Sequence, residues 1–278
     1  MRKLLLFTLF ALSSVLIITL IFTKEERVLP QGCLKLDDPY QRLECLKPYF
    51  EKLTYKYSAP IALNQAQKLK KERVIDDCHL AAHFIGEANF IKHNSDTGKA
   101  FASCSLGCIE GCYHGVMEAY IHSTQSLEEA LTQAPILCKS IAQDPLLNRQ
   151  CIHGVGHGIL RHEVVDLIQA IDLCKKFPDQ FSAKTCLEGV FMENMNENLF
   201  FDKPTLITKI PTTCEKIYPL KDEGLISMCI ESIGEGLMFY TGHDLEKSKK
   251  LCGYLPFQYQ DLCVSEAIKE AETNLSNL

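Results

Sequence analysis

Two hydrophobic patterns follow one another along the chain. Residues 4–22 are apolar and are interrupted only by serine and threonine. Beyond this run, apolar residues recur every three or four positions, as in the stretch from Glu163 to Phe177, where Val164, Leu167 and Ile171 share one helical face. No sustained alternation of apolar and polar residues indicates a strand. The pattern predicts an all-α fold behind an apolar segment.

The first apolar run is long enough to cross a bilayer. At ~1.5 Å per residue its helix approaches the ~30 Å thickness of the hydrocarbon core. The run ends without a small-residue cleavage site, so a signal anchor is favoured and a cleaved signal peptide is the alternative. We expect residues 1–3 to be a cytoplasmic end, 4–22 a transmembrane signal anchor, 23–32 a linker, and 33–278 an extracytoplasmic repeat domain in the periplasm or outside the cell.

Composition and motifs exclude several classes of function. The formal net charge is −6, and no long basic run is present, which argues against a nucleic-acid partner. The chain has no glycine-rich phosphate loop and no Gly-x-Ser-x-Gly nucleophile motif. The apolar run at residues 4–22 leaves the membrane as the one partner that the sequence indicates directly.

The chain has fourteen cysteines, and an even number behind an export signal predicts a disulfide framework. Ten of them form pairs separated by roughly 11 to 15 positions, and each pair encloses a proline. Because proline cannot continue a helix, each pair predicts a helical hairpin stapled near its turn. These pairs are Cys33–Cys45, Cys138–Cys151, Cys174–Cys186, Cys214–Cys229 and Cys252–Cys263.

Four cysteines, Cys78, Cys104, Cys108 and Cys112, lie outside these pairs. Cys108 and Cys112 would stand four residues apart on one helix, where disulfide geometry is poor. We therefore expect the disulfides Cys104–Cys112 and Cys78–Cys108. The alternative is that some of the four are free thiolates that bind a metal.

The second cysteine of each unit recurs at intervals of roughly 33 to 43 residues, the range of two-helix repeats, which predicts about seven units. Small residues follow this cysteine, as in Cys186-Leu187-Glu188-Gly189. In its Cys-Pro-Cys hairpins and these small residues, the layout resembles the cysteine-rich Sel1-like and tetratricopeptide-type repeat proteins. The resemblance implies a superhelical scaffold, without catalytic residues, that binds a protein or peptide partner in a concave groove.

Histidine or glutamate fills two positions, four residues apart, after most of the second cysteines. Residues with this spacing share one helix face, so the two possible ligands of each unit project in the same direction. Met192 is the exception in the unit of Cys186. The candidate metal ligands are His79, His83, His114, Glu118, His153, His157, Glu188, Glu231 and Glu235.

These side chains favour a transition metal as the cofactor. Imidazole suits zinc, copper, iron or nickel, and mixed imidazole and carboxylate sets suit zinc, iron or manganese. A metal-dependent hydrolase would use activated water with Glu118 or Glu235 as the proton acceptor, and an oxidoreductase is equally compatible. The alternatives are a hydrogen-bonded polar groove of a non-catalytic scaffold, haem binding, and pH sensing. Whether the protein is an enzyme stays open.

Glycines occur inside the same helical segments, at Gly86, Gly115, Gly154, Gly189 and Gly234. Each costs up to ~1 kcal/mol of helix stability relative to alanine. Close packing of neighbouring helices would offset this cost and would bring ligand pairs of adjacent units together. The alternative is that some of these segments are kinked or partly looped.

Overall fold

The computed structural model describes residues 29–162, 164–199 and 206–276, and all regular elements in these ranges are helical. The expected anchor at residues 4–22, its cytoplasmic end and most of the linker lie outside the described residues. In the ranges that the structure describes, no helix combines the length and the apolar character needed to span a membrane. The all-α prediction is confirmed for these ranges.

The chain divides into two compact units, Met1–Tyr49 and Phe50–Leu278. The first contains the 3-10 helix η1 (Cys33–Lys35) and the beginning of α2 (Pro39–Lys56). The second holds α3 (Ala59–Lys71), α4 (His79–Lys92), α5 (Thr97–Ala102), α6 (Gly111–Ser123), α7 (Leu127–Ile141), α8 (Pro145–Leu160), α9 (Leu167–Lys175), α10 (Gln180–Leu199), α11 (Leu206–Lys209), η3 (Ile210–Thr212), η4 (Tyr218–Leu220), α12 (Glu223–Tyr240), α13 (Leu245–Cys252) and α14 (Phe257–Ser276).

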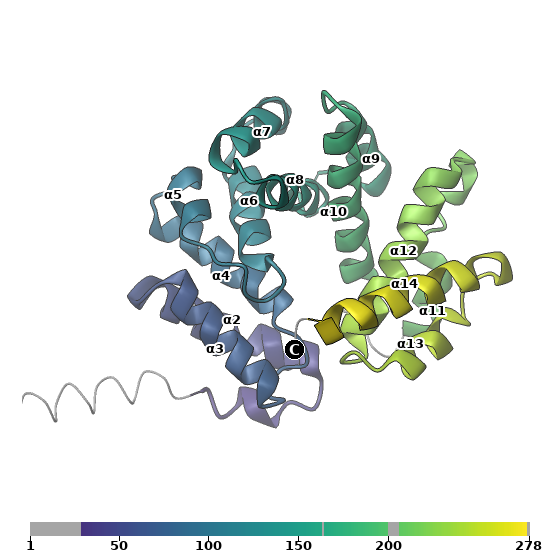
Figure 1. Ribbon diagram of the computed structural model, residues 1–278, viewed down its shortest axis with the longest axis horizontal. Helices are drawn as coiled ribbons and strands as arrows, with labels where there is room; N and C mark the ends of the chain where they lie inside the picture. Colours follow the sequence, from purple (N-terminus) through teal and green to yellow (C-terminus); the bar gives the residue numbers. More distant parts are fainter. Residues whose placement is uncertain (1–28, 163, 200–205, 277–278) are drawn as a thin grey trace, which may run out of the picture. The chain divides into compact units, whose positions relative to one another are not determined.

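Five long helices of the second unit, α4, α6, α8, α10 and α12, pack against one another in chain order, and α14 packs against α12. Figure 1 shows them following one another, with α7 and α9 on the outer side of α8 and α10. The core lies between these inner helices and the helices packed behind them. Its largest fully buried side chains include Phe101, Met117, Ile159 and Phe191.

Glycines set the distance between neighbouring inner helices. A Cβ atom at Gly115 of α6 would overlap the backbone carbonyl of His83 on α4. A Cβ at Gly189 of α10 would likewise overlap the carbonyl of His153 on α8. At Gly154 it would stand 2.8 Å from the Cα atom of His114. The predicted close packing is confirmed, and the kinked alternative is not needed because each of these glycines lies within a continuous helix.

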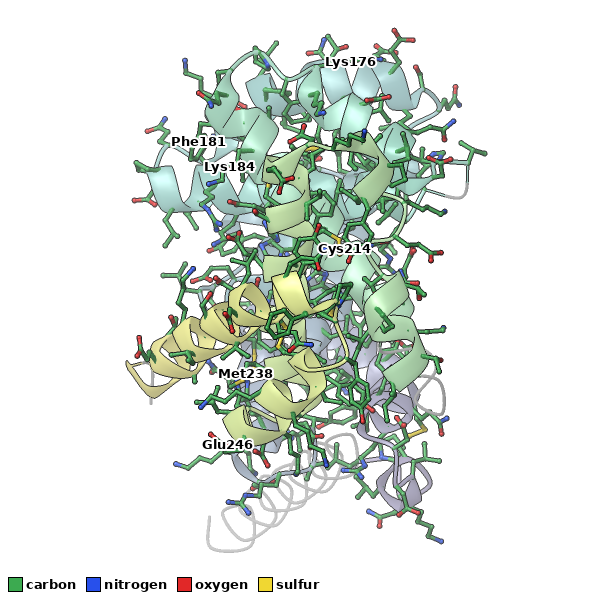
Figure 2. The ribbon with its side chains drawn as sticks, turned by 90° about the vertical axis from the view of Figure 1, so that its right-hand side faces the viewer. Lys176, Phe181, Lys184, Cys214, Met238 and Glu246 are labelled. Atoms are coloured by element: carbon green, nitrogen blue, oxygen red, sulfur yellow. A yellow bond between two sulfur atoms is a disulfide. The ribbon has the colours of Figure 1, made fainter. Side chains whose placement is uncertain are left out.

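All fourteen cysteines form the seven expected disulfides. These are Cys33–Cys45, Cys78–Cys108, Cys104–Cys112, Cys138–Cys151, Cys174–Cys186, Cys214–Cys229 and Cys252–Cys263. Three of them join the hairpins α7/α8, α9/α10 and α13/α14. Disulfides are drawn as yellow bonds in Figure 2, where Cys214 of the pair Cys214–Cys229 is labelled. No thiol is left in the described structure to bind a metal.

Two details of the hairpin prediction are wrong. Cys108 does not share a helix with Cys112, because Cys108, Ile109 and Glu110 have left-handed backbone angles and α6 begins only at Gly111. The first cysteines of two pairs, Cys33 and Cys214, lie on a 3-10 helix and in a turn rather than at the end of a long helix. The staples themselves are unaffected, because the Cα atoms lie 5.4 Å apart in Cys33–Cys45 and 6.0 Å apart in Cys214–Cys229, within the range of disulfides.

Substitution of Gly115 by alanine tests the packing. We expect Gly115→Ala to lower the free energy of unfolding by about 1–3 kcal/mol, because the new methyl group must displace the backbone of α4. The matched control is Gly98→Ala on α5, where a Cβ would meet no atom closer than 3.6 Å. The control should be neutral or slightly stabilising. Equal effects of the two substitutions in urea denaturation would contradict this explanation of the glycines.

Candidate metal centre

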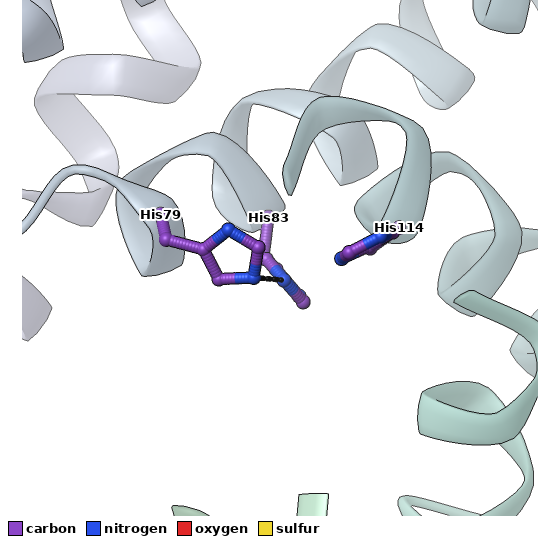
Figure 3. A group of neighbouring side chains, drawn as sticks. All are labelled: His79, His83 and His114. Carbon is purple, nitrogen blue, oxygen red and sulfur yellow. Dashed lines mark hydrogen bonds between the residues drawn. The ribbon is translucent and has the colours of Figure 1, made fainter. Parts of the chain in front are cut away.

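Five histidine side chains from three neighbouring helices converge in the second unit. His79 and His83 come from α4, His114 from α6, and His153 and His157 from α8. All are buried, with exposed fractions between 0 % for His157 and 9 % for His79. Ring centroids lie 4.7 Å apart for His79 and His83, and 4.7 Å apart for His114 and His153. Figure 3 shows the rings of His79, His83 and His114 turned toward one space.

The helix geometry explains this convergence. On α4 and on α8 the two histidines stand four residues apart, so both project from the same face. The start of α8 is defined by Asp144, whose carboxylate accepts hydrogen bonds from the first turn, and by Pro145. The glycine contacts then bring the histidine-bearing faces of α4, α6 and α8 close together.

Two of the imidazoles donate a hydrogen bond to a buried carboxylate. His83 Nδ1 lies 2.5 Å from Glu118 Oε1, and His157 Nδ1 lies 2.9 Å from Glu193 Oε2. An ionised carboxylate can only accept, so both Nδ1 atoms carry the proton. This leaves the Nε2 atom of each ring as the ligand atom, the carboxylate–histidine arrangement that supports metal centres.

Two further imidazoles donate to carbonyl oxygens. His114 Nε2 lies 2.8 Å from the side-chain oxygen of Gln150, and His79 Nδ1 lies 3.2 Å from the backbone carbonyl of Cys108. Because carbonyl oxygens accept hydrogen bonds, the opposite nitrogen of each ring keeps its lone pair. Four of the five histidines are thus oriented by an acceptor on one side.

The remaining ring nitrogens have a different environment. In the described part of the chain, no hydrogen-bond partner is present for His114 Nδ1, His157 Nε2 or either nitrogen of His153. The Nε2 atoms of His79 and His83 lie 3.0 Å apart, and two lone pairs at that distance require a proton or a cation between them. Adjacent nitrogen ligands ~2.1 Å from one metal ion would be separated by about this distance.

Three groups of side chains bring their possible ligand atoms within 4.8 Å of one another. They are His79, His83 and His114; His114, His153 and His157; and His83, Glu118 and His157. The first two groups consist of imidazoles alone and share His114, so they have the geometry to hold one ion or two neighbouring ions. The buried side chains of this cluster can hold a metal.

Arg161 provides the positive charge that the two buried carboxylates require. Its Nη1 atom lies 2.5 Å from Glu118 Oε2 and 3.2 Å from Glu87 Oε1, and its Nε atom lies 3.6 Å from Glu193 Oε1. Burial alone would raise the pKa of Glu118, but His83 and Arg161 outweigh it and hold that pKa well below its usual value. Glu118 therefore stays ionised, with both oxygens engaged, so it is not placed as the proton acceptor that we considered from the sequence.

Burial keeps most of the imidazoles neutral. It lowers the pKa of His79 to about 3, and together with the neighbouring rings it lowers the pKa of His114 and His153 well below the ordinary value. His83 differs, because its contact with Glu118 outweighs the effect of burial and raises its pKa. Neutral imidazole is the form that binds a metal ion.

The three glutamates expected from the later units, Glu188, Glu231 and Glu235, belong to none of the three groups. They line a cavity of about 200 Å³ that also contacts His79, His114 and His153. Glu188 forms an ion pair with Arg149 at 2.7 Å. The repeat places these carboxylates beside the imidazole cluster rather than within it.

Three partners of the cluster, Gln150, Arg161 and Glu193, were not predicted from the sequence. Arg161 continues the spacing of four after His153 and His157, so an extension of that pattern by one step would have found it. Glu193 directly follows Met192, the residue that breaks the pattern in its unit. Gln150 directly precedes Cys151, and no feature of the repeat pattern marks it as a partner of the cluster.

Searches of protein-family models, of curated proteins and of solved structures find no match for this chain. The interpretation of the site therefore depends on its geometry and chemistry.

Glu235 gives the cavity a measurable pH dependence. Burial, and then repulsion by Glu270 and Glu266, raises its pKa to about 8. The folded state therefore holds a proton that the unfolded state has released, so stability falls as the pH rises from about 5 to about 8, by at most ~1.4 kcal/mol per pH unit. Glu188, Glu231 and Arg149 also line this cavity.

Replacement of Glu235 by glutamine removes this titration. We expect Glu235→Gln to be more stable than the natural protein at pH 8.5, and the difference should shrink toward pH 5. Urea denaturation of both proteins at the two pH values measures it. A variant that is less stable than the natural protein at pH 8.5 would contradict the assignment.

Proposed function

We propose that the protein is an extracytoplasmic metalloprotein that binds a transition-metal ion, or a pair of ions, through His79, His83, His114, His153 and His157. One observation carries the proposal. Four of these buried imidazoles have one nitrogen held by an acceptor, while their other nitrogens lack a partner or face one another. Burying such lone pairs costs free energy that a bound metal ion would offset.

The donor set narrows the choice of metal. All cysteines are in disulfides, so thiolate-bound clusters are not an option in the described structure. A set of imidazoles suits zinc, copper, iron or nickel, whereas magnesium, calcium and manganese prefer oxygen ligands. Contact between the rings, with centroids such as those of His83 and His157 5.1 Å apart, leaves no space between them for a haem plane.

The cavity favours a chemical role for the metal ion over storage of the metal alone. Three of the five imidazoles line it, so a small ligand inside it would reach the metal. Glu235 lies in the same cavity with a pKa near 8, which suits a group that exchanges a proton with a ligand near neutral pH. Hydrolysis by metal-activated water and redox chemistry are both compatible with this arrangement. The Sel1-like peptide-binding scaffold stays the alternative.

The proposed location is outside the cytoplasm. Seven disulfides are typical of a protein that folds in an oxidising compartment. We propose that residues 4–22 anchor the chain in the membrane as a single transmembrane helix.

Metal analysis of the purified protein tests the central proposal. We expect one or two transition-metal ions per chain by elemental mass spectrometry, and loss of this metal in the double variant His153→Ala/His157→Ala. The matched control is His122→Ala, because His122 belongs to none of the three ligand groups. Natural protein that retains no metal after supplementation with zinc, copper, iron and nickel would favour the scaffold alternative.

Glu193, whose carboxylate accepts a hydrogen bond from His157 Nδ1, provides a second test. We expect Glu193→Ala to weaken metal affinity about 10- to 100-fold, because His157 loses the acceptor that orients its ring. Glu197→Ala, one turn further along α10, is the matched control and should bind as the natural protein does. Competition with a chromophoric chelator measures both. Equal affinities for Glu193→Ala and Glu197→Ala would exclude the orienting role of Glu193.

A further inference from the structure

Two pairs of inner helices, α4/α6 and α8/α10, pack in the same way. A Cβ atom at Gly115 of α6 would overlap the carbonyl of His83 on α4, and a Cβ at Gly189 of α10 would overlap the carbonyl of His153 on α8. The contacts in the other direction also match, and they are those of Gly86 with the carbonyl of Cys112 and of Gly156 with the carbonyl of Cys186. His153 therefore occupies in the second pair the place that His83 occupies in the first.

The match extends to the side chains that face these two histidines. Glu118 lies three residues beyond the contact glycine of α6 and accepts a hydrogen bond from His83 Nδ1 at 2.5 Å. Met192 lies three residues beyond the contact glycine of α10, so the same packing places it on the side of that helix that faces His153. Both Met192 and His153 are buried and line the same cavity. A thioether thus stands where the first pair of helices has a carboxylate.

This exchange explains the environment of His153. Thioether sulfur is only a weak hydrogen-bond acceptor, so His153 lacks the partner that orients His83. Among the residues that the structure describes, neither ring nitrogen of His153 has a hydrogen-bond partner, and His114 Nδ1 and His157 Nε2 are likewise buried without one. These three histidines form one of the groups whose possible ligand atoms lie within 4.8 Å of one another. The free ligand atoms of the cluster therefore gather beside Met192.

The sulfur atom of Met192 changes which metal ion this group prefers. Zinc takes imidazole, thiolate and carboxylate ligands, whereas soft thioether sulfur favours Cu(I). Every cysteine of the described structure is in a disulfide, so no thiolate competes for a soft ion. Neutral imidazoles and a thioether carry no charge, so a monovalent ion leaves less uncompensated charge in this buried site than a divalent ion would.

We propose that Met192 is a metal ligand and that it binds Cu(I) together with His114, His153 and His157. The inference rests on the proposed function, because the imidazoles must bind a metal ion, and it adds a fourth ligand and the identity and oxidation state of the metal. Met192 is the one exception to histidine or glutamate at the repeated positions of the central units. That exception is then the residue that determines metal specificity.

Matched variants of the full-length protein test the inference. Leucine is similar in size to methionine but has no sulfur, so Met192→Leu keeps the packing and removes the ligand. We expect its Cu(I) affinity to fall by about 10-fold or more, because loss of a ligand costs at least as much as loss of an outer partner. Its Zn²⁺ affinity should stay within about 2-fold of the natural value, because thioether is not a usual zinc ligand. Competition with bicinchoninate, under anaerobic conditions with ascorbate as the reductant, measures Cu(I), and a chromophoric zinc chelator measures Zn²⁺.

Met238→Leu on α12 is the matched control. Met238, which is labelled in Figure 2, is buried but lies outside the set of described residues that line the cavity. This variant should bind both ions as the natural protein does.

X-ray absorption spectroscopy of the Cu(I)-loaded protein provides a readout that a purely structural role of Met192 would not change. We expect the copper ion of the natural protein to have one sulfur neighbour beside its nitrogen neighbours. This sulfur should be absent in Met192→Leu and present in Met238→Leu.

The outcomes separate this inference from the proposed function. If the natural protein binds zinc, iron or nickel but not Cu(I), or binds Cu(I) with nitrogen neighbours alone, the thioether inference is wrong and the metal centre stands. Unchanged Cu(I) affinity in Met192→Leu, or equal losses of Cu(I) and Zn²⁺ affinity, would also overturn the inference and leave the metal centre in place. A natural protein that binds none of these ions overturns both.

Discussion

The close approach of α4, α6 and α8 is the constraint on which the candidate centre depends. The backbone carbonyl of His83 on α4 fills the space where Gly115 of α6 would otherwise carry a side chain, and a Cβ atom at Gly154 of α8 would stand 2.8 Å from the Cα atom of His114 on α6. Short imidazole side chains can therefore meet across helix boundaries. With a larger residue at these positions the helices would separate, and histidines on different helices would lose contact. The same glycines weaken each helix in isolation, so the fold requires another source of stability.

The disulfides are that source. Units of two short helices bury limited apolar surface, and here part of the interior is given to imidazole and carboxylate groups. A staple across each hairpin stabilises the fold by about 3 kcal/mol on the loop-entropy account. Such cross-links allow a polar cluster at a place where a purely hydrophobic core would otherwise be needed. The covalent framework and the buried site are thus linked in physical terms.

Local patterns in the sequence predicted the helices, the seven disulfides and the five histidines, because hairpin staples and residues four apart on one helix depend on short stretches of chain. Of the carboxylates that join the cluster, they predicted Glu118 but not Glu193. Glu188 and Glu235 occupy positions of the repeat pattern but line the cavity. Glu193 lies one residue outside that pattern, yet it contacts His157. That difference depends on the rotation of α10 and α12 about their axes, which tertiary packing decides and the spacing of residues does not.

The charges around the cluster support a binding centre over a merely structural polar network. A structural network would be expected to satisfy its own members. Here the outer side does so, since Arg161 joins Glu87, Glu118 and Glu193 into a closed set of ion pairs. The inner side does not, because His114, His153 and His157 keep nitrogens without partners, and His114 and His153 line a cavity rich in carboxylates. A ligand site requires side chains that are held in place by hydrogen bonds and ion pairs on one side and that keep free ligand atoms on the other side.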